Sequence, residues 1–199
     1  MVLFAVMGKL GSGKTLFITR EAYHYATKGY TIYTNYHLIG IKHKRLKSPE
    51  HLLQIGLKKN PIKKAVFLDE GYLWFDALTK NVERQKFYRN LINITRKMGL
   101  VVFITTQSLG QINLRTRMLF DAFFEPHMYH KGKRYVMKVN ISQSDYYNGF
   151  MTLKTYWIKN VNRYFQYYDT LEIINDFVKD YVTPEIPNDG LQTSLNAMF

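Results

Sequence analysis

The sequence predicts an α/β protein with a mainly parallel sheet flanked by helices and antiparallel strands added at one edge. Three observations lead to this prediction. Short apolar runs of strand type alternate with helical patterns up to residue 107, an order typical of a parallel sheet that helices cover on both faces. A glycine-rich loop joins the first strand to the first helix. After Phe120 the chain becomes aromatic and β-branched, which favours antiparallel strands.

Four buried strands are expected in the first part of the chain. Each is a short run rich in Val, Ile, Phe or Tyr, and they span residues 2–7, 30–35, 64–70 and 100–107. Helix-forming residues predict helices over 14–28, 48–56 and 82–99. Gly29 and Gly99 end the first and the last of these helices, as glycine often does.

The second part of the chain predicts the antiparallel additions. Aromatic and β-branched segments of strand type cover 122–129, 134–142, 150–159 and 163–170, and HKGK at 130–133 is typical of a hairpin turn. Residues 171–182 are expected to form a closing helix. We therefore expect a single domain over 1–182 and a flexible C-terminal tail over 183–199, which contains two prolines and a glycine.

The composition narrows the classes of partner. The chain has 199 residues, of which 46% are hydrophobic, and a formal net charge of +13. It has no Cys, which excludes disulfides and Cys-based metal sites. No apolar run approaches the roughly 18 residues of a membrane-spanning helix, so no membrane span is expected. Residues 41–64 hold eight Lys or Arg and one Glu, which favours a nucleic acid partner. The alternative is a basic surface that only aids solubility.

GKLGSGKT at residues 8–15 matches the pattern G-x-x-x-x-G-K-[ST] between a predicted strand and a predicted helix. This context predicts a loop that holds the phosphates of ATP, through its backbone N–H groups and the helix N-terminus. Lys14 is expected to reach the β- and γ-phosphates, and the Thr15 hydroxyl to bind Mg²⁺. The alternative is an ordinary glycine-rich turn. The predicted nucleotide-binding residues are Gly8, Lys9, Leu10, Gly11, Ser12, Gly13, Lys14 and Thr15.

Asp69 and Glu70 end the buried strand at 64–70. Ligands of parallel sheets bind beyond the carboxyl ends of the strands, so both carboxylates are expected to face the phosphates. Asp69 is predicted to hold Mg²⁺ and Glu70 to act as the general base for the attacking water. The alternative is a strand that ends at a solvated acidic turn.

The strand at 100–107 ends in polar residues. If it neighbours the strand of Asp69, the Gln107 amide lies beside the γ-phosphate and can sense hydrolysis; otherwise it is an ordinary polar strand end. An arginine from a neighbouring subunit would neutralise charge in the transition state. Arg96 is the first choice for this role, and the other candidates are Arg84, Arg89, Arg115 and Arg117.

These motifs together resemble the FtsK–HerA superfamily of ring-forming, DNA-translocating ATPases. Within it, the chain looks like the genome-packaging ATPases of icosahedral viruses, and residues 11–38 also resemble the Zot-type ATPases of filamentous phage assembly. The resemblance is carried by three further stretches besides the loop. They are VFLDEGYLWF at 66–75, RKMGLVVFITTQSLGQINLRTR at 96–117 and YYDTLE at 167–172.

The resemblance implies a RecA-like P-loop core and a ring, hexameric or pentameric, with ATP sites at the subunit interfaces and DNA through the middle. It supports Asp69 and Glu70 as the acidic pair, Gln107 as the sensor and Arg96 as the arginine that acts on the neighbouring subunit. The expected catalytic residues are therefore Glu70, Gln107 and Arg96, together with Lys14. After the core, neither a separate DNA-orienting domain of the FtsK kind nor a membrane span of the Zot kind is expected. The latter absence favours packaging over extrusion.

The expected function is an ATP-driven translocase that packages double-stranded viral DNA into a preformed capsid. Such a protein would work in the host cytoplasm, at the capsid vertex. A Zot-type extrusion ATPase, a small-molecule kinase and a nucleotide-switched DNA-binding module are the alternatives. The Asp-Glu pair disfavours the kinase, which has no need for a base of its own. Expected DNA contacts are Lys42, Lys44, Arg45 and Lys47, followed by Lys131, Lys133 and Arg134.

Overall fold

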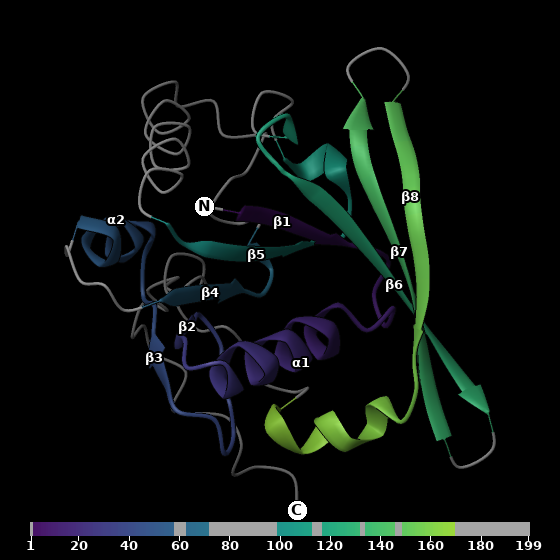
Figure 1. The fold of residues 1–199 in the computed structure, drawn as a ribbon, viewed down its shortest axis with the longest axis horizontal. Helices are drawn as coiled ribbons and strands as arrows, with labels where there is room; N and C mark the ends of the chain where they lie inside the picture. Colours follow the sequence, from purple (N-terminus) through teal and green to yellow (C-terminus); the bar gives the residue numbers. More distant parts are fainter. Residues whose placement is uncertain are drawn as a thin grey trace, which may run out of the picture.

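A computed structural model describes residues 2–57, 63–71, 99–112, 117–131, 134–145 and 149–169. Its described strands form one eight-stranded sheet in the order β3-β2-β4-β5-β1-β6-β7-β8 (Figure 1). The strands are β1 (Val2–Met7), β2 (Thr31–Thr34), β3 (His43–Arg45), β4 (Lys64–Leu68), β5 (Val101–Thr106), β6 (Ala122–Lys131), β7 (Arg134–Asp145) and β8 (Gly149–Ile158). The helices are α1 (Lys14–Thr27), α2 (Pro49–Leu57) and the short 3-10 helices η2 (Leu109–Gln111) and η3 (Val161–Tyr167).

The parallel half of the sheet is confirmed. β4 lies between β2 and β5, and β5 pairs with β1, all in parallel. Every residue of β4 is buried, as expected of a strand that is covered on both faces. The structure adds one strand that the sequence does not predict. β3 is a three-residue parallel strand at the sheet edge, within the basic stretch that was expected to hold only loop and a short helix.

The second half corrects two predictions. β7 and β8 are antiparallel, and Lys131 pairs with Arg134 across the predicted hairpin. β6, however, also pairs in parallel with β1, so it joins the two halves of the sheet. The predicted strand at 163–170 is wrong, because 161–167 form η3. The buried residues of η3 are Val161 and Tyr164, a spacing of three that matches one 3-10 turn and not a strand.

Two apolar cores lie on opposite faces of the sheet. Side chains alternate between the faces along each strand, so Ala5 packs in one core and Val6 in the other. The first core includes Leu52 of α2. The second contains the buried face of α1 together with Val161 and Tyr164, and Figure 1 shows η3 alongside α1. The apolar faces of α1 and η3 therefore stabilise the same side of the sheet.

Several predictions lie outside the described residues. These are the helices at 82–99 and 171–182, the tail at 183–199, the domain boundary at residue 182 and the turn residues 132–133. None of the helices in the described ranges combines the length and the apolar character that crossing a bilayer needs.

Candidate functional site

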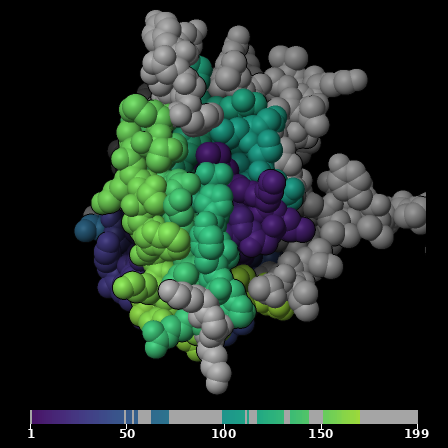
Figure 2. Space-filling view, turned by 90° about the vertical axis from the view of Figure 1, so that its right-hand side faces the viewer, coloured from purple at the N-terminus to yellow at the C-terminus, as the bar shows by residue number. Residues whose placement is uncertain are grey.

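The glycine-rich loop connects β1 to α1 in a backbone conformation that demands glycine. Gly13, the residue that precedes α1, has φ of 94°, in the left-handed region that only glycine adopts readily. A Cβ atom there would lie 2.7 Å from Met128 Cγ and 2.9 Å from Met137 Cε. The loop therefore packs directly against β6 and β7. Figure 2 shows the purple N-terminal segment at the surface beside the teal and green strands.

The start of α1 provides favourable conditions for binding an anion. Gly13 has no side chain to cap the helix, and the first turn of α1 contains no acidic residue. The N–H groups at a helix start lack intrahelical partners and carry the positive end of the helix dipole. The loop and the first turn of α1 together therefore present backbone donors to a phosphate.

Lys14 lies over the loop. Its side chain is nearly buried, and Nζ donates hydrogen bonds to the carbonyl oxygens of Gly8 at 2.9 Å and Lys9 at 3.1 Å. These bonds hold the ammonium group at the mouth of the loop. A phosphate oxygen is a stronger, charge-assisted acceptor than a neutral carbonyl, so an arriving phosphate would draw Nζ away from the loop.

Asp69 is the centre of a hydrogen-bond network at the carboxyl ends of the strands. The Thr15 hydroxyl donates to Asp69 Oδ2 at 2.8 Å, and the Thr105 hydroxyl donates to Oδ1 at 2.7 Å. Asn35 binds the Asp69 backbone, with Nδ2 donating to the carbonyl at 2.7 Å and Oδ1 accepting from N–H at 2.8 Å. Burial raises the pKa of the Asp69 carboxyl, and the bonds from Thr105 and Thr15 oppose that rise.

Glu70 follows in an unusual backbone conformation. Its φ is 47°, a left-handed value that is uncommon for a residue other than glycine. The Glu70 N–H donates to the Thr105 hydroxyl oxygen at 2.7 Å. Thr105 therefore binds both acidic residues at once and fixes the turn that holds Glu70 in this strained geometry. Strain of this kind is frequent where function requires it.

The residues at this point fit a hard divalent cation such as Mg²⁺. The Thr15 hydroxyl and the Asp69 carboxylate are oxygen ligands of the kind that Mg²⁺ prefers, and their oxygens lie 2.8 Å apart. The carboxylate is buried at 9% exposure, where a bound cation would compensate the cost of its charge. Thr15 and Asp69 are thus the residues that would hold the ion.

A cavity of about 420 Å³ brings these groups together. Its walls include seven of the predicted site residues, five from the phosphate loop and the acidic pair Asp69 and Glu70. It also includes residues that the sequence analysis did not select. The lining residues are Leu10, Gly11, Gly13, Lys14, Thr15, Leu16, Tyr36, Asp69, Glu70, Met128, Tyr135, Phe165, Tyr168 and Asp169.

Thr105, Asn35 and Tyr168 are the notable residues that sequence reasoning missed. Asn35 follows β2 as Asp69 follows β4, so its place at the end of a parallel strand was a usable signal. Tyr168 comes from the end of η3, which no local pattern connects to the loop. Burial, and secondarily the charge of Asp69, raises the pKa of Tyr168 to about 12. The Tyr168 phenol therefore stays protonated near the carboxylate.

Gln107 and the arginines stay predictions. β5 does lie beside β4, as the sensor role requires. Gln107 itself is exposed and is not among the described residues that line the cavity. Arg117 Nε donates to the Ile112 carbonyl at 2.7 Å. Arg96 lies outside the described residues, as do the remaining candidates Arg84, Arg89 and Arg115.

The predicted DNA contacts fall at two distant places. Lys42, Lys44, Arg45 and Lys47 are exposed on and around β3, at one edge of the sheet. We call these four residues the basic edge. Arg134 is exposed at the start of β7, whereas Lys133 and the side chain of Lys131 lie outside the described parts. The two groups are separated by the strands between β3 and β7.

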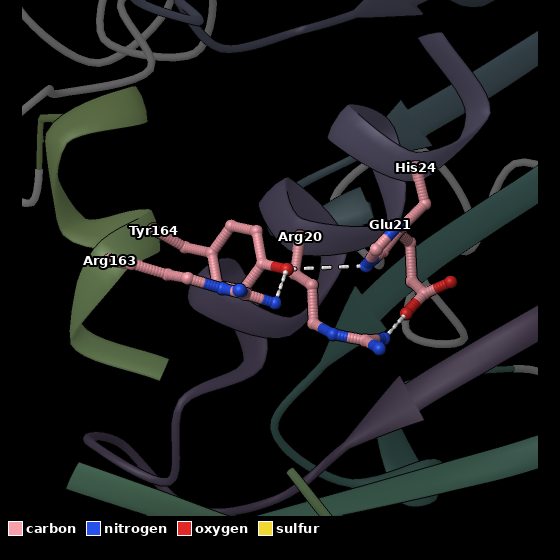
Figure 3. A network of polar contacts seen from close by, with 5 residues as sticks. All are labelled: Arg20, Glu21, His24, Arg163 and Tyr164. Carbon is pink, nitrogen blue, oxygen red and sulfur yellow. Dashed lines mark hydrogen bonds and ion pairs between the residues drawn. The ribbon is translucent and has the colours of Figure 1, made fainter. Parts of the chain in front are cut away.

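A polar network attaches η3 to α1 (Figure 3). The Tyr164 hydroxyl lies 3.3 Å from His24 Nε2, and Arg163 Nη2 donates to the same hydroxyl at 2.7 Å. Arg20 forms an ion pair with Glu21, the next residue along α1. Burial, and then the nearby cations Arg20 and Arg163, lower the pKa of His24, so its ring is neutral near pH 7.

Replacing Gly13 by Ala tests the fit of the loop against β6 and β7. The matched control is Gly11→Ala, because Gly11 is also left-handed, at 76°, but a Cβ there meets nothing within 4 Å. Gly11→Ala should cost about 1–2 kcal/mol through backbone strain alone. Gly13→Ala should cost about 1–3 kcal/mol more through crowding against the two methionines. Urea unfolding measures both values, and equal losses would contradict the proposed packing.

Solved structures resemble the fold of this chain. No protein-family model and no curated protein matches the sequence. The N-terminal domain of zonular occludens toxin from Neisseria meningitidis is 17% identical, with 84% of this chain and 98% of that domain covered at a TM-score of 0.51. The genome-packaging NTPase B204 from Sulfolobus turreted icosahedral virus 2, solved with AMP, is 13% identical, with 77% and 96% covered at 0.51.

The ATPase domain of the protein G40P is 11% identical, with 84% of both chains covered at a TM-score of 0.53. At identities this low, the structural likeness establishes a common fold and leaves the activity open. The order of strands, the loop between β1 and α1 and these likenesses agree with one another. The protein has the RecA-like P-loop ATPase fold, with antiparallel strands added at one edge.

Proposed function

We propose that the protein is an ATP-driven DNA translocase that packages double-stranded viral DNA into a preformed capsid. The observation that carries the ATPase part is the hydrogen bond between Thr15, at the phosphate loop, and Asp69, at the end of β4. It brings an anion-binding loop and a buried carboxylate to one cavity, which Glu70 also lines. A solved structure of similar fold holds AMP, which supports a nucleotide as the ligand.

Hydrolysis follows from the positions of these side chains. The loop amides and Lys14 bind the triphosphate, and Lys14 exchanges its bonds to Gly8 and Lys9 for phosphate oxygens. Glu70 accepts the proton of the attacking water. Thr15 and Asp69 would hold Mg²⁺, which would supply positive charge to the phosphates when bound. Gln107, at the end of the neighbouring strand β5, orients the water or senses the loss of the γ-phosphate.

The motor part of the proposal rests on the charge of the chain and on its fold. The chain carries a net charge of +13, and the basic edge is exposed, as sequence-independent contacts to DNA phosphates require. The subunits would form a ring of five or six, with Arg96 of each subunit completing the site of the next. The ring would act in the host cytoplasm at the capsid vertex. The fold is shared with a viral packaging NTPase.

A Zot-type ATPase of filamentous virus assembly is the second candidate. The likeness to the toxin domain covers 98% of that domain. A small-molecule kinase is disfavoured, because its acceptor substrate removes the need for a base such as Glu70. The two leading candidates share the ATP chemistry and differ in the nucleic acid that stimulates turnover.

Duplex DNA should stimulate ATP hydrolysis, and longer duplexes should do so more strongly. The rate is measured with linear duplex, single-stranded circular DNA and no DNA. Stimulation by duplex supports packaging, whereas stimulation by single-stranded circles alone supports the filamentous alternative. No response to either would contradict a DNA motor. Glu70→Gln serves as the control, because it should bind ATP and hydrolyse it very slowly.

Thr105→Val should weaken Mg²⁺-dependent catalysis without removing any predicted ligand. The change deletes the bonds to Asp69 Oδ1 and to the Glu70 N–H. The loss of a bond that orients a metal ligand typically costs about 10–100-fold in metal affinity or activity. We expect a lower kcat and a higher Mg²⁺ requirement. Thr155→Val, which removes an exposed hydroxyl bonded to Asn140, is the control, and identical behaviour of the two variants would count against this role of Thr105.

Replacing the four residues of the basic edge by Gln should reduce DNA affinity. Each phosphate contact contributes about 0.9 log units of affinity per log unit of salt, so the slope of affinity against salt should flatten. The basal ATPase rate should persist, because these residues lie on and around β3, away from the cavity lining. Arg134→Gln tests the other candidate region. An unchanged slope in the quadruple variant would place the DNA contact elsewhere.

A further inference from the structure

We propose that Met128, Tyr135 and Phe165 form a nucleobase subsite that holds the base of the bound nucleotide by its ring face. The inference rests on the proposed ATPase function and adds to it the residues that bind the base. All three side chains line the same cavity as the phosphate loop and the acidic pair. They come from β6, β7 and η3, outside the motifs that define the phosphate end.

The cavity has two chemically different sides. Lys14, Thr15, Asp69 and Glu70 form a charged side, where a polyphosphate and its cation fit. The rest of the lining is mostly apolar and aromatic, with Asp169 as its one further charged residue. Phe165 is 39% exposed, and its ring meets that of Tyr135 edge to face, with centroids 5.3 Å apart at 71°. One elongated ligand with an anionic end and a flat apolar end matches both sides.

The two sides are adjacent through Gly13. Met128 and Met137 approach this loop residue so closely that a Cβ atom has no room. A nucleotide whose phosphates occupy the loop therefore has β6 and β7 as its nearest wall. Methionine and aromatic rings are the side chains that pack well against a flat π-system. The base thus finds its contact surface where the phosphate site ends.

Neighbouring residues support the rings of Tyr135 and Phe165, which we call the aromatic wall. The ring of His130 lies against Tyr135, with centroids 4.7 Å apart. Phe165 follows Tyr164, which is buried and linked to His24 of α1. Figure 3 shows Tyr164 of η3 pointing toward α1. The supporting contacts restrict both rings before a ligand arrives, which lowers the entropic cost of binding.

The subsite should bind adenine and guanine with similar affinity. Among Met128, Tyr135 and Phe165, the phenol of Tyr135 is the one side-chain group that can form a strong hydrogen bond. An apolar pocket separates related ligands by about 10–200-fold, whereas a site built to hydrogen-bond a ligand separates them by about 10⁴–10⁵-fold. We therefore expect ATP and GTP to differ by less than about 200-fold in affinity.

The test compares ATP, GTP and inorganic triphosphate, each with Mg²⁺, binding to the full chain by calorimetry. Phe165→Ala should raise the Kd of ATP by roughly 5- to 150-fold, the range for loss of one base–aromatic contact. The Kd of inorganic triphosphate should not change, because that ligand has no base. Phe165→Tyr should restore ATP binding. Trp157→Ala, which removes an exposed aromatic residue outside the cavity, should change neither Kd.

Other outcomes overturn the subsite. Equal weakening of ATP and triphosphate by Phe165→Ala would show that Phe165 only supports the fold, and unchanged ATP binding would remove it from the base contact. If Phe165→Ala unfolds, Phe165→Leu keeps the apolar volume and should still weaken ATP selectively. More than about 200-fold preference of the wild type for ATP over GTP contradicts recognition by the ring face. Failure of the wild type to bind any of the three ligands overturns the ATPase proposal itself.

Discussion

The hydrogen bonds that Asp69 accepts from Thr15 and Thr105 are the interaction on which the site depends. They join the first turn of α1 to the ends of β4 and β5, so the phosphate loop has a defined position relative to the acidic pair. Asp69 is buried, and burial raises the pKa of its carboxyl. The hydroxyl donors offset part of that cost. Both carboxylate oxygens are oriented by a hydroxyl donor before a cation arrives. On cation binding, Thr105 would keep its bond to Asp69 and Thr15 would become a ligand itself.

The parallel half of this arrangement was predictable from sequence because its signals are local. Apolar runs define the strands, and the spacing from Gly8 to Thr15 defines the loop. Asp69 can bond to Thr105 only if β4 and β5 are neighbours in the sheet. From the sequence, this adjacency was a condition and not a prediction. β3 escaped prediction because three residues in a basic stretch carry no period. Residues 163–170 were misassigned because Tyr and Phe favour strands locally, whereas burial against α1 selects a 3-10 turn.

The apolar side of the cavity could not be predicted from the sequence, because no local pattern marks it. Met128, Tyr135 and Phe165 lie more than 100 residues beyond the loop in the chain, and each stands in a segment whose own pattern suggests only a strand. Their place in one cavity with Gly13 depends on how β6 pairs, parallel to β1 and antiparallel to β7. No local pattern encodes that change of direction. Glycine at position 13 is required by its left-handed backbone conformation, and the two methionines that occupy the space of its missing side chain add a second reason.

α1 connects the two sides physically. Its first turn carries Lys14 and Thr15, and its later turns carry His24, which contacts Tyr164 of η3. Phe165 and Tyr168 belong to the same short segment as Tyr164, and both line the cavity. A shift of α1 on phosphate binding would therefore disturb the contact between His24 and Tyr164 that supports this segment. The neutral state of His24 keeps this contact a simple hydrogen bond, without the repulsion that a cationic ring would suffer from Arg20 and Arg163. In the proposed nucleotide site, the antiparallel strands would thus serve as a wall, in addition to extending the sheet.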